Sequence, residues 1–105
     1  MPDFEYEGGS IDVDEDGFMT EPDQWNELIA KAMADTEGVD ELTDDHWKVV
    51  NYLRDYFKQY GVAPMIRKLC KETGFKLKVI YELFPSGPAK GACKVAGLPK
   101  PTGCV

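Results

Sequence analysis

Four short apolar stripes at helical spacing, each followed by a glycine or a proline, constrain the fold of this chain more than any other feature. Apolar side chains recur in each stripe every three or four residues, which places them on one face of an α-helix. The stripes are Trp25, Leu28, Ile29, Ala32 and Met33; Trp47, Val50, Leu53, Phe57 and Tyr60; Ile66, Leu69 and Cys70; and Leu77, Ile80, Tyr81 and Phe84. Within 105 residues, such helices predict a mainly α fold, a small orthogonal helical bundle.

Capping residues predict where these helices begin and end. Thr20 is expected as the N-cap of the first helix and Thr43 as the N-cap of the second, because a side-chain oxygen there accepts a bond from a free backbone N–H. Pro64 is expected to begin the third helix. Gly38, Gly61, Gly74 and Pro85 follow the four stripes, which is typical of helix ends.

An N-terminal β-hairpin is expected to precede the bundle. Phe4, Tyr6, Ile11 and Val13 alternate with polar residues on either side of the pair Gly8-Gly9. Alternation with a period of two indicates strands with one apolar face, and the glycines favour a turn between them. Two strands have little stability by themselves, so the hairpin is expected to pack on the bundle.

Candidate metal sites in the sequence are weak, and we expect none. Asp12, Asp14 and Asp16 imitate the start of a calcium-binding loop, but the closing position holds Asp23 instead of glutamate and no helix precedes the loop. The single histidine, His46, has no cysteine or second histidine at ligand spacing, so a surface or partly buried side chain is expected.

The charge of the chain is divided between its two halves. Residues 1–60 have a net charge of −13 and residues 61–105 have +6. The helices between Thr43 and Phe84 could form a helix-turn-helix-like unit, and Arg67, Lys68 and Lys71 on its middle helix suggest a DNA-binding regulator. The carboxylates of the first half oppose contact with phosphate, so DNA is not the expected partner.

The stretch Gly91 to Val105 reads GACKVAGLPKPTGCV and carries two of the three cysteines, Cys93 and Cys104. Its prolines and glycines exclude a long helix, and no Asp or Glu occurs from Pro85 onward. We therefore expect a bundle over residues 1–84 and a mobile, cationic C-terminal arm over 85–105. A short helix from 88 through 96 is expected to carry Cys93, with Cys104 beyond it and both thiols accessible.

The spacing of the arm cysteines leaves two geometries open. Eleven residue steps span at most about 36–40 Å, whereas a disulfide needs Cα atoms within about 4.4–6.8 Å. The arm can therefore project outward or fold back until Cys104 meets Cys93. The third cysteine, Cys70, lies in register with Ile66 and Leu69 and is expected to be a buried structural thiol.

Several stretches of this chain resemble the DsrC/TusE family of sulfur-carrier proteins. They read DEDGFM, LTDDHWKVVNYLRDYF, YELFPSGPAKGACK and CKVAGLPKPTGCV, and the resemblance covers essentially the whole chain. The presence of both Cys93 and Cys104 implies the branch that works with dissimilatory sulfite reductase. The resemblance implies that Cys104 accepts sulfur and that Cys93 then attacks it, which leaves a trisulfide between them.

The resemblance also implies partners and cofactors. The alpha and beta subunits of the reductase would be the partners, siroheme and iron–sulfur clusters would belong to them, and this chain would bind no cofactor. It would act as a gamma subunit or protein co-substrate that is not catalytic by itself, and a membrane-bound reductase complex would regenerate its thiols. The alternative within the family is a persulfide relay for tRNA 2-thiouridine synthesis, in which Cys104 acts without Cys93.

A cytoplasmic location is expected from the residues themselves. The acidic start MPDFEYEGG lacks the basic and apolar regions of a signal peptide. Three cysteines are an odd number, which suits a reducing compartment better than a disulfide framework.

Overall fold

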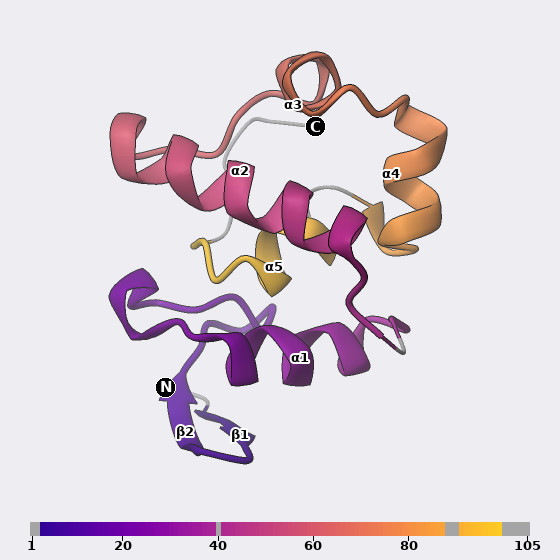
Figure 1. Cartoon of the computed structure of the whole chain (residues 1–105). Coiled ribbons are helices and arrows are strands. Elements are labelled where there is room, and N and C mark those ends of the chain that lie inside the picture. Colours follow the sequence, from indigo (N-terminus) through magenta and orange to yellow (C-terminus); the bar gives the residue numbers. More distant parts are fainter. Residues whose placement is uncertain (1–2, 40, 88–90, 100–105) are drawn as a thin grey trace.

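The computed structural model of this chain describes residues 3–39, 41–87 and 91–99, and it confirms a mainly α fold with an N-terminal antiparallel hairpin (Figure 1). The elements in chain order are β1 (Asp3–Tyr6), β2 (Gly9–Asp12), a short 3-10 helix η1 (Pro22–Gln24), α1 (Glu27–Thr36), α2 (Asp44–Tyr60), α3 (Ile66–Thr73), α4 (Leu77–Leu83) and α5 (Cys93–Val95).

The short turn α5 lies between the two longest helices, α1 and α2 (Figure 1). On the outer side of α2, α3 packs against it and α4 continues from α3, while the hairpin lies beside α1. One apolar core joins these layers, and its largest fully buried side chains include Phe84, Met19, Ile29, Met33, Leu53 and Leu98. The last described segment of the chain is therefore enclosed by earlier ones.

The expected N-cap of α2 and the glycines expected to end α2 and α3 are confirmed, whereas the expected start of α3 at Pro64 is wrong. Thr43 is the N-cap of α2, and Gly61 follows the last residue of that helix in the left-handed conformation, with φ of 74°. Gly74 ends α3 in the same way, with φ of 80°. Met65 takes the N-cap position of α3, one residue after the expected Pro64.

His46 is more buried than expected, because it joins the start of α2 to the end of α4. Its Nδ1 accepts hydrogen bonds from the Thr43 backbone N–H at 3.0 Å and from the Thr43 hydroxyl at 2.8 Å, while its Nε2–H donates to the Leu83 carbonyl at 2.7 Å. The ring also meets the Phe84 ring edge-on, with centroids 5.1 Å apart. These contacts make His46 a structural residue of the bundle.

We expect the substitution His46→Leu to lower the free energy of unfolding by about 3 kcal/mol, because it leaves the Thr43 N–H and the Leu83 carbonyl without partners. The melting temperature, measured by circular dichroism, should fall by roughly 10–20 °C. His46→Gln is the matched control, because a glutamine can still accept the Thr43 N–H. An unchanged melting temperature for His46→Leu would contradict the structural role.

The expected start of the first helix is wrong. Thr20 does not cap it; η1 comes first, and Asn26 is the N-cap of α1, accepting a bond from the Ile29 N–H at 3.0 Å. Trp25 therefore lies before the helix in an extended conformation and takes no part in its apolar face. The buried face of α1 consists of Ile29, Ala30, Met33 and Ala34.

The predicted apolar faces of α2 and α4 are only partly buried. Tyr60 is 56% exposed, Leu77 47% and Tyr81 50%. Val49 on α2 is fully buried in the core, although the predicted apolar stripe of this helix did not include it. The spacing of apolar residues predicts which face of a helix is buried, but it does not predict which residues at the margin of that face a neighbouring helix covers.

The hairpin and the acidic turn after it follow the expected pattern. β1 and β2 pair antiparallel with Phe4 opposite Ile11, and Val13 forms a further bridge with Met19. Between these bridged residues, the Asp14 carboxylate accepts bonds from the Asp16 N–H at 2.9 Å and the Phe18 N–H at 3.0 Å. This carboxylate thus serves to close a turn.

Candidate functional site

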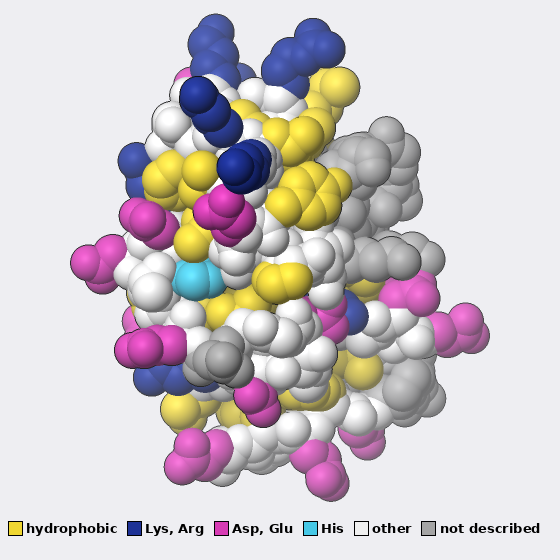
Figure 2. All heavy atoms as spheres, turned by 90° about the vertical axis from the view of Figure 1, so that its right-hand side faces the viewer, with side chains coloured by type: hydrophobic (Ala, Val, Ile, Leu, Met, Phe, Trp, Pro, Cys, Tyr) yellow, Lys and Arg dark blue, Asp and Glu magenta, His cyan; other side chains and the backbone are white. Residues whose placement is uncertain are grey.

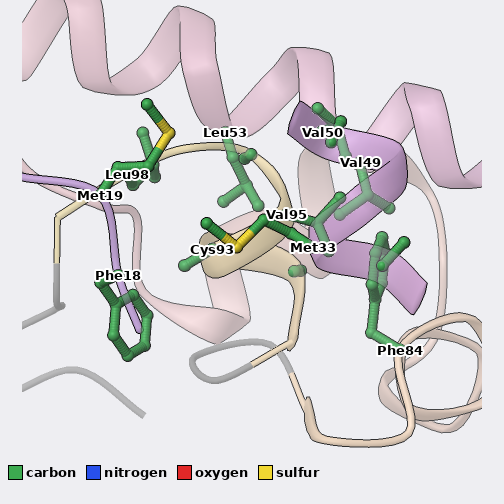
Figure 3. Packing of buried hydrophobic residues seen from close by; sticks show 14 of the residues in the cluster. Phe18, Met19, Met33, Val49, Val50, Leu53, Phe84, Cys93, Val95 and Leu98 are labelled. Atoms are coloured by element: carbon green, nitrogen blue, oxygen red, sulfur yellow. The ribbon is translucent and has the colours of Figure 1, made fainter. Parts of the chain in front are cut away.

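Cys93, the predicted site residue that the structure describes, is the first residue of α5 and is only 4% exposed. Its neighbours along the chain are buried as well: Gly91, Ala92, Val95, Ala96, Gly97 and Leu98. Figure 3 shows Cys93 and Val95 inside the core cluster, among side chains from α1, α2 and the segment of Phe18 and Met19. Residues 91–98, which we expected within a mobile arm over 85–105, therefore belong to the core.

Cys104, the other predicted site residue, lies outside the described residues. The mobile arm expected there stays a prediction, as does any pairing of Cys104 with Cys93. The short helix expected over residues 88–96 is present in its described part as α5, with Gly97 at its end in the left-handed conformation, φ 74°.

Two side chains bind the backbone carbonyls at the end of α5. The Trp25 Nε1–H donates to the Val95 carbonyl at 2.9 Å, and the Arg54 Nη1–H donates to the Ala96 carbonyl at 2.8 Å. The Arg54 guanidinium also lies over the Trp25 ring, 4.2 Å from its centroid. We call Trp25 and Arg54 the carbonyl clamp.

Burial lowers the pKa of Arg54 from its ordinary value, and the nearby carboxylates of Asp23 and Asp55 act in the opposite direction. A guanidinium nevertheless keeps its proton in proteins. The clamp therefore places a positive charge beside the carbonyl end of α5, where the partial charge of the peptide groups is negative.

Lys94 joins α5 to the end of α1. Its ammonium lies 3.2 Å from the Glu37 carboxylate, just after the end of α1, and 5.3 Å from the centroid of the Phe18 ring. Both side chains of the ion pair are 14% exposed, so the pair is less screened by water than a surface pair. Lys94 thus contacts residues of the acidic half of the chain. The sequence analysis had included it only among the basic residues of the expected arm.

The order of thiol burial differs from the prediction. Cys70 on α3 is half-buried, whereas Cys93, expected to be accessible, lies in the core. The small residues Gly91, Ala92 and Ala96 around Cys93 are the signal that could have indicated this, because small side chains allow close packing between helices.

Sequence reasoning missed three residues that hold the site: Arg54, Glu37 and Trp25 in its actual role. Trp25 had been assigned to a helical stripe, and Arg54 lies on the largely polar side of α2 with no local pattern around it. Their partners are forty to seventy positions away along the chain, a separation that no local pattern reveals.

The basic residues suggested for DNA binding are exposed on α3. Figure 2 shows Lys and Arg side chains gathered at the top of the molecule, over α3 and α4, and acidic side chains mainly below them. The described residues include no group of three or more His, Cys, Asp or Glu side chains placed to hold a metal ion. None of the helices among the described residues has the length and hydrophobicity that a membrane span requires.

Comparison with known proteins identifies the family. The family model described as DsrC like protein matches residues 5–105, so this chain belongs to the DsrC family. The dissimilatory-type sulfite reductase subunit gamma of Nitratidesulfovibrio vulgaris (Hildenborough) is 54% identical over 105 residues, which cover all of both chains.

Two further comparisons agree with this assignment. The sulfurtransferase TusE of Escherichia coli (strain K12) is 40% identical over 107 residues, which cover 95% of this chain and 97% of TusE. In the crystal structure of dissimilatory sulfite reductase I, a chain that is 54% identical superposes with a TM-score of 0.93, covering 99% of this chain and all of that one. The fold and the family are thus established together.

Proposed function

We propose that this chain is a sulfur carrier that acts with the alpha and beta subunits of dissimilatory sulfite reductase in the reduction of sulfite to sulfide. Cys104 accepts the sulfur, and Cys93 resolves the loaded state. The observation that carries this proposal is the placement of Cys93 on a turn held by α1, α2 and the carbonyl clamp, ahead of the stretch that contains Cys104. Two thiols suit two successive steps on one sulfur atom: Cys104 would accept the sulfur, and the fixed thiol of Cys93 would then attack it.

The chemistry balances with both thiols. One sulfite ion and the two thiols take up two electrons and four protons, and they give a trisulfide between Cys93 and Cys104 with release of three water molecules. Four further electrons and four protons release hydrogen sulfide and restore both thiols. The reductase supplies the first electrons, and a membrane-bound reductase complex supplies the rest.

This division of labour leaves the redox cofactors with the partners. Siroheme and iron–sulfur clusters belong to the alpha and beta subunits, and this chain acts as their gamma subunit or protein co-substrate without turnover of its own. The cycle takes place in the cytoplasm, where reducing conditions keep free thiols available between turnovers.

A persulfide relay to tRNA is the second candidate, and the burial of Cys93 is the observation that favours it. At 4% exposure, Cys93 meets an incoming persulfide only if Cys104 reaches the surface of the core beside it or if α5 moves. In a relay Cys93 would have no chemical role, and Cys104 would pass its sulfur to another protein. The TusE relatives share this chain's length and fold family.

The proposal is tested by intact-protein mass spectrometry after incubation with the reductase, sulfite and an electron donor. We expect the chain to gain one sulfur atom and lose two hydrogen atoms, which is the composition of the trisulfide. Incubation without the reductase is the control and should leave the mass unchanged. Complete reduction of sulfite to sulfide with the chain never carrying sulfur would contradict the proposal.

A further inference from the structure

The carbonyl end of α5 has more hydrogen-bond partners than so short a turn requires. The last carbonyls of a helix lack partners within it, and in most helices water or a following glycine turn satisfies them. Here the turn satisfies two by itself, because the Leu98 N–H donates to the Cys93 carbonyl at 3.1 Å and the Gly97 N–H donates to the Lys94 carbonyl at 3.0 Å. The next carbonyls, of Val95 and Ala96, are bound by side chains that lie far away in the sequence.

The two clamp residues form one unit. Besides its bond to Ala96, Arg54 donates through Nη2 to the Pro22 carbonyl at 3.4 Å, so its guanidinium joins η1 to the residue that follows α5. The same guanidinium stacks on Trp25, which follows η1. Only the planar, forked head of arginine can bind two carbonyls and lie on an aromatic ring at the same time.

The clamp acts beside the last described residues of the chain. Gly97 reverses the chain with φ of 74°, and the Trp25 indole lies directly against it. Leu98 is still buried, whereas Pro99 is only half-buried. The conformation of the last described residues is thus fixed beside the indole and the guanidinium.

We propose that Arg54 and Trp25 are positioning residues for the thiol chemistry of Cys93: they fix the turn that carries it and the residues that directly follow this turn. This inference rests on the proposed function, because it assigns both cysteines to one intramolecular step. For comparison, a short flexible linker between two groups gives an effective concentration in the millimolar range. A fixed origin raises that concentration by removing arrangements in which the two thiols face apart.

The test measures ring closure directly, without the reductase or sulfite. In the full-length chain carrying Cys70→Ser, the Cys93 and Cys104 thiols exchange with glutathione disulfide, which takes up two electrons and two protons to give two glutathione molecules. The equilibrium constant of this exchange is the effective concentration of the two thiols. We expect it to fall about tenfold in Arg54→Met and in Trp25→Phe, because each removes a hydrogen bond to the carbonyl end of α5.

Three further variants separate positioning from general stability. Arg54→Lys keeps the positive charge and can bind one of the two carbonyls, but it lacks the planar fork, so it should give an intermediate effective concentration. Arg67→Met removes an exposed charge from α3 and should match the parent. Leu69→Ala lowers the melting temperature from a core position on α3 and should leave the effective concentration unchanged. The proposal is overturned if the clamp variants equal the parent, if their effective concentration rises, or if Leu69→Ala lowers it as much as they do. Because sulfite is absent, a failed sulfur transfer would not alter this result.

Discussion

Replacement of Cys104 by alanine is expected to abolish sulfur loading of this chain, whereas replacement of Cys93 by alanine is expected to stop the cycle after loading. In the proposed cycle Cys104 forms the first bond to the incoming sulfur, so its loss leaves no acceptor. Without Cys93 the loaded sulfur has no internal thiol to attack it, and the chain should remain as a persulfide on Cys104 or attached to the reductase. Mass spectrometry of both variants after a turnover mixture distinguishes these outcomes.

The choice of alanine matters at Cys93 because this side chain is buried. Alanine removes one sulfur atom from a buried site at a cost of about 1 kcal/mol, whereas serine would replace the thiol with a more polar hydroxyl in the core. Thermal melting of both cysteine variants is the control and should show a folded chain in each. Full sulfite reduction with Cys93→Ala would show that the resolving role is wrong, and the one-cysteine relay would then be the better account.

The substitution Gly97→Ala is expected to cause the largest loss of stability of any methyl-sized change in the described chain. A Cβ atom at this position would lie 2.3 Å from Cδ1 and 2.7 Å from Cγ of Trp25, and the backbone has φ of +74°. The left-handed conformation and the displaced indole together should cost about 3–4 kcal/mol. The melting temperature should therefore fall by roughly 15 °C or more.

A matched glycine separates these two causes. Gly38 also has a positive φ, of +82°, but a Cβ atom there would meet nothing within 4 Å. Gly38→Ala should therefore cost only about 1 kcal/mol, the conformational part of the effect. Equal melting temperatures for the two alanine variants would show that the indole does not lie against Gly97.

Much of the fold could be predicted from local sequence signals. Thr43, Gly61 and Gly74 mark helix ends because capping depends on a few neighbouring residues, and these positions agree with the structure. The start of α1 was misplaced because Thr20 and Asn26 are both good caps, and the choice between them depends on packing. Trp25 lies before the helix, where its indole reaches the Val95 carbonyl.

The thiol chemistry of the site stays a prediction, whereas the buried setting of Cys93 could not be predicted from the sequence. Two cysteines in a stretch without carboxylates indicated thiol chemistry, and the family match follows the same motif. The sequence also suggested an arm from residue 85 onward, because prolines and glycines exclude long elements. They do not exclude a buried turn, and Gly91, Ala92 and Ala96 provide the small surface that lets α5 fit between α1 and α2.

The enclosure of α5 has a consequence for synthesis on the ribosome. The apolar faces of α1 and α2 are complete as soon as residue 60 has been translated, yet the segment that lies between them, residues 91–98, is translated much later. Until that segment emerges, side chains such as Met33 and Leu53 lack part of their final packing, and a nascent chain with uncovered apolar surface is prone to aggregation. The segment that carries Cys93, to which we assign the resolving role, thus also completes the core, so a chain interrupted before it would lose solubility together with the proposed thiol chemistry.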